Sequence, residues 1–307
     1  MRETHSSGVC QLVRSHAAYP SLLQQIFDPP PVLYVSGQGD WERGLGATSV
    51  ALVGSRDATS YGIAMARSLG RGLAESGVTV VSGLALGVDA AAHAGALEAE
   101  GTTVAVVGSG IDVIYPRRNR RLREEILRCG LLVAEWPLGT QPRPAYFPQR
   151  NRIISGLSLA VVVVEAGQRS GALGTARQAL EQGREVLAVP GPAGAPRSVG
   201  PNGLLKAGAG LVETVDDILD ALPLARRPPA ALPKRDLPSG SSEVLAALAG
   251  GARTVDEIAA RSGKRTQEVW SQLLQLEVRG LIQRGPAGRF ERVQGGGRAE
   301  EVPSSGG

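Results

Sequence analysis

The chain has 307 residues, of which 42% are hydrophobic and only 4% aromatic, and its net charge is +4. That length allows one large or two modest domains, and the 41 glycines indicate a core of small aliphatic side chains between glycine turns. The longest apolar run, residues 157–164, is too short to cross a membrane, and the N-terminus lacks the apolar segment of a signal peptide. We therefore predict a soluble, cytoplasmic protein.

The first part of the chain alternates apolar runs with amphipathic segments. Residues 1–18 carry little structural signal, and residues 19–37 predict a short helix, a proline-rich turn and a strand. Further strands are predicted at 49–53, 78–82, 103–107, 131–134, 160–164 and 186–189, and helices at 62–76, 88–100, 120–128 and 172–182. Apolar strands that alternate with helices are typical of a mostly parallel sheet covered on both faces. We predict a Rossmann-like doubly wound α/β domain over residues 19–220.

The C-terminal part predicts a second, smaller domain. Residues 221–240 contain five prolines and no periodicity, which indicates a linker. Residues 241–293 then predict helices at 242–248, from Thr254 onward and at 266–279, followed by a hairpin of 281–284 with 289–293. Thr254 and Glu257 form a capping box at the start of the second helix. Three helices and a hairpin indicate a winged-helix domain, and residues 294–307 are expected to be a disordered tail.

Positive charge is concentrated in one region of the sequence. From Asp112 to Arg152 there are nine arginines and four acidic residues, a net charge of +5 against +4 for the whole chain. Such a region is expected of a protein that binds a polyanion. A solvated helix face near residues 117–128 would have the same composition, so that part of the region stays open to either interpretation.

Glycine-rich turns follow the predicted strands, at 54–56, 83–87, 108–110, 167–174 and 190–191. Ligands of doubly wound sheets bind beyond the carboxyl ends of the strands, where glycine lets a phosphate approach the backbone. The dinucleotide fingerprint and the Walker pattern are both absent, which leaves NAD and ATP unsupported. Asp89 is interpreted as a helix cap and His93 as a structural histidine. With no nucleophile–base pair and no carboxylate cluster for a metal, we expect no cofactor and no catalytic residue.

Residues 146–184 contain the groups that a single-stranded nucleic acid requires. Tyr146 and Phe147 offer stacking surfaces, and the next residues of the stretch supply two cations and an amide, from Arg150, Arg152 and Asn151. Beyond a buried strand, Ser170, Gly171 and Thr175 lie at the start of a predicted helix, which favours an anion. Arg56 ends the turn after an earlier strand, and the fold would bring it to the same edge.

Several motifs resemble those of one known family. They are, in order, 53–56, 82–85 with 87–89, 147–156, 164–166, 170–183 and 188–191, and they follow the pattern of the DprA/Smf family of bacterial DNA-processing proteins. The resemblance covers residues 19–220, and residues 241–293 look like the winged-helix domain of that family. Many members also carry an N-terminal helical domain. Because only 18 residues precede Tyr19, we expect either that this domain is missing here or that the start of the sequence is wrongly placed.

The resemblance implies a non-enzymatic function. Members of the family work as homodimers that bind incoming single-stranded DNA without sequence preference, protect it, and load RecA recombinase onto it during natural transformation and recombination. Carried over motif by motif, the DNA pocket would be formed by Gly54, Ser55, Arg56, Phe147, Arg150, Asn151, Arg152, Ser170, Gly171 and Thr175.

Two other functions stay open at this point. A Rossmann-like enzyme that binds or hydrolyses nucleoside phosphates would use the loop at 170–175 and the nearby Glu165. A regulator that binds duplex DNA through the winged helix would rely on Lys264 and Arg265. The residues after them are mostly Gln and Glu, a weak surface for a DNA groove.

Overall fold

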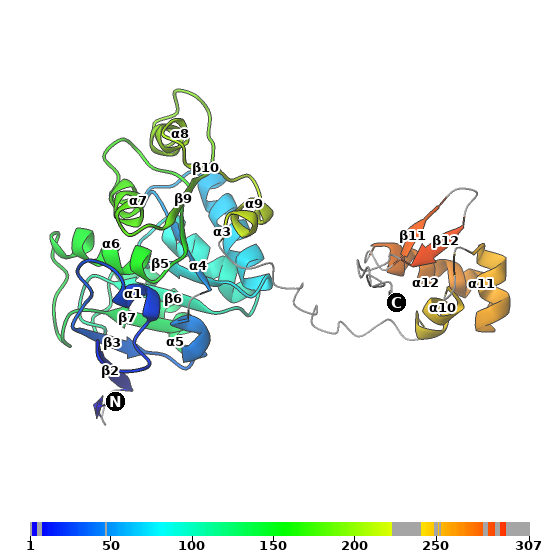
Figure 1. Ribbon diagram of the computed structural model, residues 1–307, viewed down its shortest axis with the longest axis horizontal. Coiled ribbons are helices and arrows are strands. Elements are labelled where there is room, and N and C mark those ends of the chain that lie inside the picture. Colours follow the sequence, from blue (N-terminus) through cyan, green and yellow to red (C-terminus); the bar gives the residue numbers. More distant parts are fainter. Residues whose placement is uncertain are drawn as a thin grey trace, which may run out of the picture. The chain divides into compact units, whose positions relative to one another are not determined.

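A computed structural model of the chain describes residues 2–4, 8–46, 48–222, 241–248, 251, 253–278, 282–285 and 289–292 (Figure 1). The chain divides into two compact units, Met1–Pro228 and Pro229–Gly307, and each is described by itself. Of the helices within the described residues, none is both long and apolar enough to cross a membrane.

The first unit is built around one ten-stranded sheet with the order β1-β2-β3-β7-β6-β5-β4-β8-β9-β10. Its parallel centre consists of β4 (Ser49–Val53), β5 (Thr79–Ser82), β6 (Thr103–Val107), β7 (Leu131–Ala134), β8 (Ala160–Val163), β9 (Glu185–Ala188) and the short β10 (Gly210–Leu211). These strands confirm the predicted, mostly parallel sheet. The chain order reverses between β4 and β8, which is the place where doubly wound folds bind ligands.

Antiparallel strands extend the sheet beyond β7. They are β3 (Val32–Ser36), β2 (Val9–Val13) and β1 (Arg2–Thr4). No strand was predicted before residue 19, yet Cys10 and Leu12 of β2 are buried in the core. Five residues that mix Cys and Gln with apolar side chains are a weak local pattern, and the strand depends on its pairing with β3. The first domain therefore includes residues that we expected to carry little structure.

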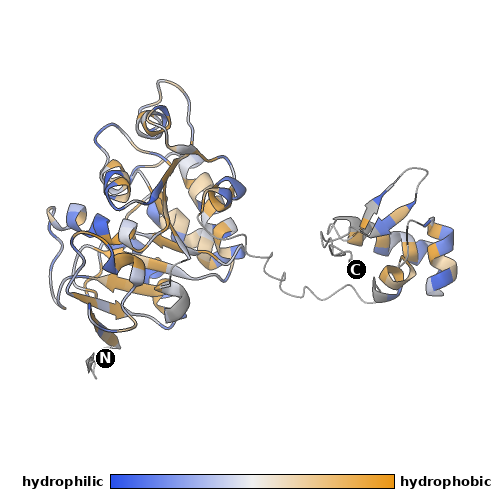
Figure 2. Cartoon of the chain, viewed as in Figure 1, coloured by the Kyte–Doolittle hydropathy of each residue, from blue (hydrophilic) through white to orange (hydrophobic). Residues whose placement is uncertain are grey.

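Helices cover both faces of the sheet. One face carries α3 (Ser60–Glu75), α4 (Val88–Glu98) and α9 (Val215–Ala221), and the other carries α1 (Ser21–Gln24), α6 (Tyr146–Gly156), α7 (Gly171–Glu181) and α8 (Val199–Lys206). Along β4, Val50 and Leu52 face the first layer while Ala51 and Val53 face the second. Because both faces are buried, the central strands are mostly hydrophobic, as Figure 2 shows.

Two short helices and one longer one flank this arrangement. They are α2 (Trp41–Gly44), the 3₁₀ turn η1 (Arg117–Asn119) and α5 (Arg120–Cys129). Ile126 of α5 packs with Ala105 of β6 and Leu132 of β7 in a small core of its own. Leu122 and Leu127 of α5 pack against the same core while partly exposed, and most of the arginines of this helix are exposed.

The helix α6 was not predicted from the sequence, and neither were β1, β2, α2, α8, β10 and α9. Its first turn contains Pro148, which lacks an N–H but needs none there, because the first N–H groups of a helix have no intrahelical partner. Its second half buries Ile153 and Ile154 against the sheet. Packing rather than local propensity therefore stabilises this helix.

The second unit has the predicted order of helices and hairpin. It contains α10 (Ser241–Ala247), α11 (Val255–Ser262), α12 (Thr266–Val278) and the antiparallel strands β11 (Ile282–Arg284) and β12 (Phe290–Arg292). The capping box of Thr254 with Glu257 is confirmed. The predicted linker, residues 221–240, starts too early, because Ala221 ends α9 and Leu222 is buried. Residues 223–240 and the predicted tail, residues 294–307, lie outside the described residues.

We predict that Gly95→Ala destabilises the first unit. A Cβ at Gly95 of α4 would lie 2.0 Å from the carbonyl oxygen of Arg67 on α3, so the two helices would have to move apart. Overpacking of this kind costs about 1–3 kcal/mol. The matched control is Gly203→Ala in α8, where a Cβ meets nothing within 4 Å and the better helix propensity of Ala adds up to about 1 kcal/mol. Urea unfolding measures both, and equal stability of the two variants would contradict the close α3–α4 packing.

Candidate nucleic-acid interface

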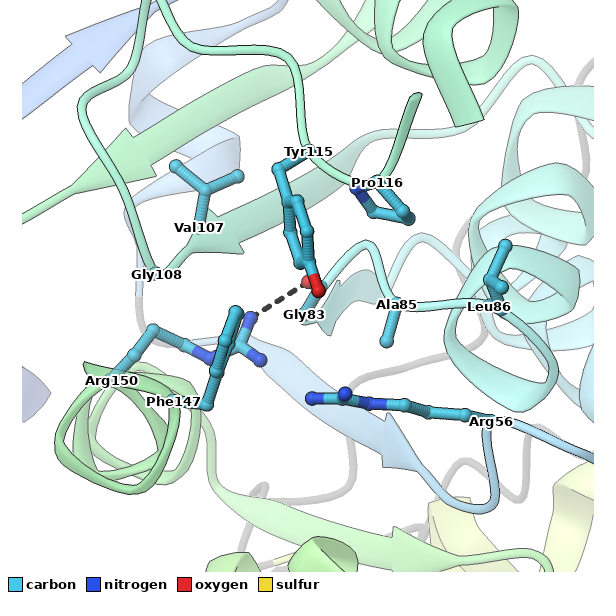
Figure 3. A pocket seen from close by; sticks show the side chains of 10 residues that line it. All are labelled: Arg56, Gly83, Ala85, Leu86, Val107, Gly108, Tyr115, Pro116, Phe147 and Arg150. Atoms are coloured by element: carbon cyan, nitrogen blue, oxygen red, sulfur yellow. Dashed lines mark hydrogen bonds between the residues drawn. The ribbon is translucent and has the colours of Figure 1, made fainter. Parts of the chain in front are cut away.

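A cavity lies where β4, β5 and β6 end and α6 begins (Figure 3). We call it the strand-end pocket, and it is lined by Arg56, Gly83, Ala85, Leu86, Val107, Gly108, Tyr115, Pro116, Phe147 and Arg150. The lining comes from the turns after three parallel strands, from the segment before η1 and from the first turns of α6. It is therefore at the predicted edge of the sheet.

Aromatic and cationic side chains face one another in this pocket. The guanidinium carbon of Arg56 lies 5.1 Å from the centre of the Phe147 ring, within the range of a cation–π contact. The Tyr115 ring centre lies 5.5 Å from that of Phe147, with 34° between the ring planes. Phe147 is half-buried and Arg56 is exposed. Figure 3 shows these three side chains around the same space, open to a planar ligand.

The floor of the pocket is held by a buried arginine. Arg150 is only 4% exposed, and its Nη1 donates to the carbonyl oxygens of Gly83, at 2.7 Å, and of Val106. Burial lowers the pKa of Arg150, the attraction of Asp89 opposes this, and the repulsion from nearby Arg56 adds to it. The net result is a pKa of about 10. The guanidinium remains charged at neutral pH. It ties α6 to the ends of β5 and β6.

Asp89 is the buried carboxylate that attracts Arg150. It accepts hydrogen bonds from the backbone N–H groups of Gly83, at 3.1 Å, and Ala85, at 3.3 Å. Burial raises the pKa of Asp89, while Arg150 and these hydrogen bonds oppose the rise. Asp89 thus fixes the turn after β5 in addition to its place in the first turn of α4.

In two of the glycine turns, after β5 and after β6, protein side chains occupy the space that a phosphate would need. A Cβ at Gly83 would lie 2.3 Å from Nη1 of Arg150, and one at Gly108 would lie 2.9 Å from the Phe147 ring. Glycine is needed at both positions because side chains of α6 approach the backbone there. The glycines that we interpreted as phosphate contacts thus serve, in these two turns, to seat Arg150 and Phe147.

Gly54 and Ser55 lie beside the pocket without lining it. The N–H of Ser55 donates to the carbonyl oxygen of Glu165 at 2.7 Å, and its carbonyl accepts from the N–H of Val88 at 3.2 Å. These bonds fix the turn after β4 between β8 and α4. Their effect is to direct Arg56 toward Phe147.

The other predicted contacts are not brought into the strand-end pocket. Arg152 is 14% exposed and forms ion pairs with Glu135 and with Asp28. The side-chain amide of Asn151 donates to the carbonyl oxygen of Gly171 at 3.3 Å. The remaining three predicted contacts lie at the start of α7, where Ser170 caps the helix, Gly171 is its exposed first residue and Thr175 is buried.

Tyr115 and Pro116 line the pocket but were not predicted from the sequence. They belong to residues 111–116, which have neither helical nor strand periodicity, and an isolated Tyr-Pro pair was the one available signal. Tyr115 is 41% exposed and forms one wall of the pocket.

Glu165 and His93 both have structural partners. Glu165 is buried and accepts bonds from the N–H of Thr59, at 2.9 Å, and from the Thr59 hydroxyl, at the start of α3. A carboxylate engaged in this way is a poor general base for the nucleotide-hydrolysing alternative. His93 is buried with Nδ1 2.7 Å from the hydroxyl of Thr103, in agreement with a structural role.

Comparison with known families assigns both units. Residues 11–223 match the model of DNA recombination-mediator protein A, and residues 228–288 match that of the DprA winged helix domain. The chain belongs to the DNA recombination-mediator protein A family. The predicted DprA/Smf resemblance is confirmed, as is the α/β domain followed by a winged helix.

Individual members of the DprA family are similar over most of the chain. Protein Smf of Escherichia coli is 43% identical over 279 residues, which cover 88% of this chain and 74% of the relative. The crystal structure of DprA from Streptococcus pneumoniae is 39% identical with a TM-score of 0.67, covering 70% of this chain and 75% of that one. DprA from Helicobacter pylori, studied structurally for its single-stranded DNA binding mode, is 30% identical with a TM-score of 0.63, covering 70% and 95%.

We predict that His93 makes stability depend on pH. Burial, with a smaller effect of Arg150, lowers its pKa from 6.5 to about 3. Between these two pH values the unfolded chain binds a proton that the folded chain does not. The free energy of unfolding should therefore fall as the pH drops from 6.5 toward 3, by at most about 1.4 kcal/mol per pH unit.

The variant His93→Gln isolates this effect, because Asp89 and the other carboxylates titrate in both proteins. Urea unfolding at a series of pH values should give a flatter stability profile for the variant in that window. Parallel profiles for the two proteins would show that His93 is protonated in the folded chain.

Proposed function

We propose that the chain binds single-stranded DNA without sequence preference in the strand-end pocket. The observation that carries the proposal is the stack of the Arg56 guanidinium on Phe147, opposite Tyr115, at the carboxyl ends of the strands. Every base has a flat face that an aromatic ring can stack on, and every nucleotide has a phosphate that a guanidinium attracts. The study of the Helicobacter pylori relative with single-stranded DNA supports this choice of ligand.

The residues of the pocket have separate roles in this proposal. Arg56 binds a phosphate, and Phe147 with Tyr115 stacks a base. Arg150 supports Phe147. It also adds positive potential, because it interacts electrostatically with a second guanidinium, that of Arg56, as well as with one buried carboxylate, Asp89. Gly54 and Ser55 orient the turn that carries Arg56.

Three of the remaining predicted contacts would act on the strand outside the pocket. Ser170 and exposed Gly171 lie at the N-terminus of α7, which attracts a phosphate, and Asn151 is bonded to Gly171. Arg152 is held by Glu135 and Asp28, and Thr175 is buried. We assign these two residues to the positioning of α6 and α7.

We extend the proposal to the biological role through membership of the family. The chain would be a non-enzymatic homodimer that protects incoming single-stranded DNA and loads RecA recombinase onto it during transformation and recombination. Family membership supports this role, and the pocket supplies the DNA-binding step on which it depends.

The variant Arg56→Ala should weaken binding to oligo-dT about tenfold and reduce the salt slope of binding by about one unit, because one phosphate contact is lost. Phe147→Ala should cost about 1–3 kcal/mol with an unchanged salt slope, because stacking is not ionic. Fluorescence anisotropy of a labelled oligonucleotide over a salt series measures both quantities.

The control for charge is Arg71→Ala, which removes an exposed arginine from the last turns of α3. It should bind as the unchanged protein does. If Arg56→Ala and Arg71→Ala gave the same affinity and salt slope, the strand-end pocket would not be the DNA site.

RecA loading and dimerisation are tested separately. The unchanged protein should shorten the delay before RecA filaments form on single-stranded DNA, and Arg56→Ala should lose this effect because it no longer holds the strand. Sedimentation equilibrium should give the mass of two chains. Filament formation at the same rate with and without the protein would refute the loading role while leaving DNA binding intact.

A further inference from the structure

A second cavity lies next to the same helix, between α6, α7 and the end of β7. We call it the tryptophan groove, and its lining includes Asp28, Glu135, Trp136, Gln149, Arg152 and Gln178. No residue of its lining is shared with the strand-end pocket. The two cavities draw on neighbouring residues of α6, because Phe147 and Arg150 line one while Gln149 and Arg152 line the other.

Trp136, which lines this groove, belongs to an aromatic stack. The Trp136 and Tyr146 rings are stacked with their centres 4.6 Å apart and 29° between their planes. The guanidinium carbon of Arg143 lies 5.9 Å from the centre of the Tyr146 ring. Consecutive residues of a helix point about 100° apart, so Tyr146 and Phe147 carry aromatic surfaces in two directions from one turn. Trp136 is half-buried and borders the groove.

The polar groups of the groove suit a base and not a phosphate. Arg152 is the one cation among its lining residues, and it already pairs with Glu135 and Asp28. Two carboxylates against one guanidinium leave no positive charge for a phosphate. Carboxylate oxygens only accept hydrogen bonds, and Oε1 of Gln178 is a buried acceptor without a partner.

An indole face beside oxygen acceptors matches a planar ring that carries an amino group. Cytosine, adenine and guanine each present such a donor, and acidic side chains accept from the cytosine amino group in known complexes. Thymine has no amino group, and its one edge donor, N3–H, is flanked by two carbonyl oxygens that the carboxylates of Asp28 and Glu135 would repel.

We propose that the tryptophan groove is a second nucleobase subsite, which takes an amino-bearing base of the bound strand and stacks it on Trp136. The inference rests on the proposed binding of single-stranded DNA in the strand-end pocket. It adds a contact on the other side of the first turn of α6. At that one position it favours cytosine, adenine or guanine over thymine, while the strand-end pocket accepts any base.

The test uses Trp136 as its own probe. The chain has three tryptophans, and the double variant Trp41→Phe with Trp270→Phe leaves Trp136 alone. This protein is titrated with oligo-dC and oligo-dT of equal length, while anisotropy of a labelled strand follows binding. Oligo-dC should quench the Trp136 emission over the same concentrations at which it binds, and oligo-dT should quench it less.

The second measurement removes the stacking surface. In the otherwise unchanged protein, Trp136→Ala should weaken oligo-dC binding about tenfold and oligo-dT binding less, because one stacked base is lost. Trp136→Phe keeps a ring and should retain most of the affinity. Circular dichroism checks that each variant is folded, and if Trp136→Ala is not, the emission titration and Trp136→Phe decide.

The outcomes separate this inference from the function on which it rests. Binding of both oligonucleotides with an unchanged Trp136 emission would overturn the subsite and leave the strand-end pocket in place. Binding of neither oligonucleotide would overturn both. Quenching by an arginine-rich peptide but not by oligo-dC would identify the groove as a protein-docking site and would also overturn the inference.

Discussion

The buried guanidinium of Arg150 is the interaction on which the site depends. A charge removed from water is tolerated only when hydrogen bonds and an opposite charge compensate for the lost hydration. Here the carbonyl oxygens of Gly83 and Val106 and the charge of Asp89 provide that compensation. Any shift of α6 along the sheet would break these contacts. Phe147 lies three residues earlier on the same helix, so it is held in place over Arg56.

The fold was largely predictable because its strands are buried on both faces. The runs at β6 and β7 are continuously apolar and end at glycine or polar residues, so their bounds follow from composition alone. The helix α6 gave no such signal. Its Ile153 and Ile154 are buried and Arg150 is bonded to distant strands, and these contacts arise only once the sheet exists.

For the candidate site, only its place at one edge of the sheet was predictable. Parallel strands end at one edge, and this rule alone was enough to bring Arg56 near α6. The sequence could not show which arginines are free to bind DNA, because the carboxylates that pair with them come from remote segments. Glu135 and Asp28 meet Arg152 from two such segments, and the sequence around Arg152 contains no sign of either. Tyr115 was missed for a related reason, since its segment has no periodicity.

The basic region of the sequence therefore overstates the charge that a DNA strand would meet. Of its nine arginines, Arg150 is buried, Arg152 pairs with two carboxylates and Arg120 pairs with Glu124. Arg123 donates to a backbone carbonyl. With these cations engaged, stacking must provide a larger share of the affinity than the net charge suggests. Stacking needs rigid rings more than it needs charge, and the first turn of α6, fixed by Arg150, carries two of them side by side.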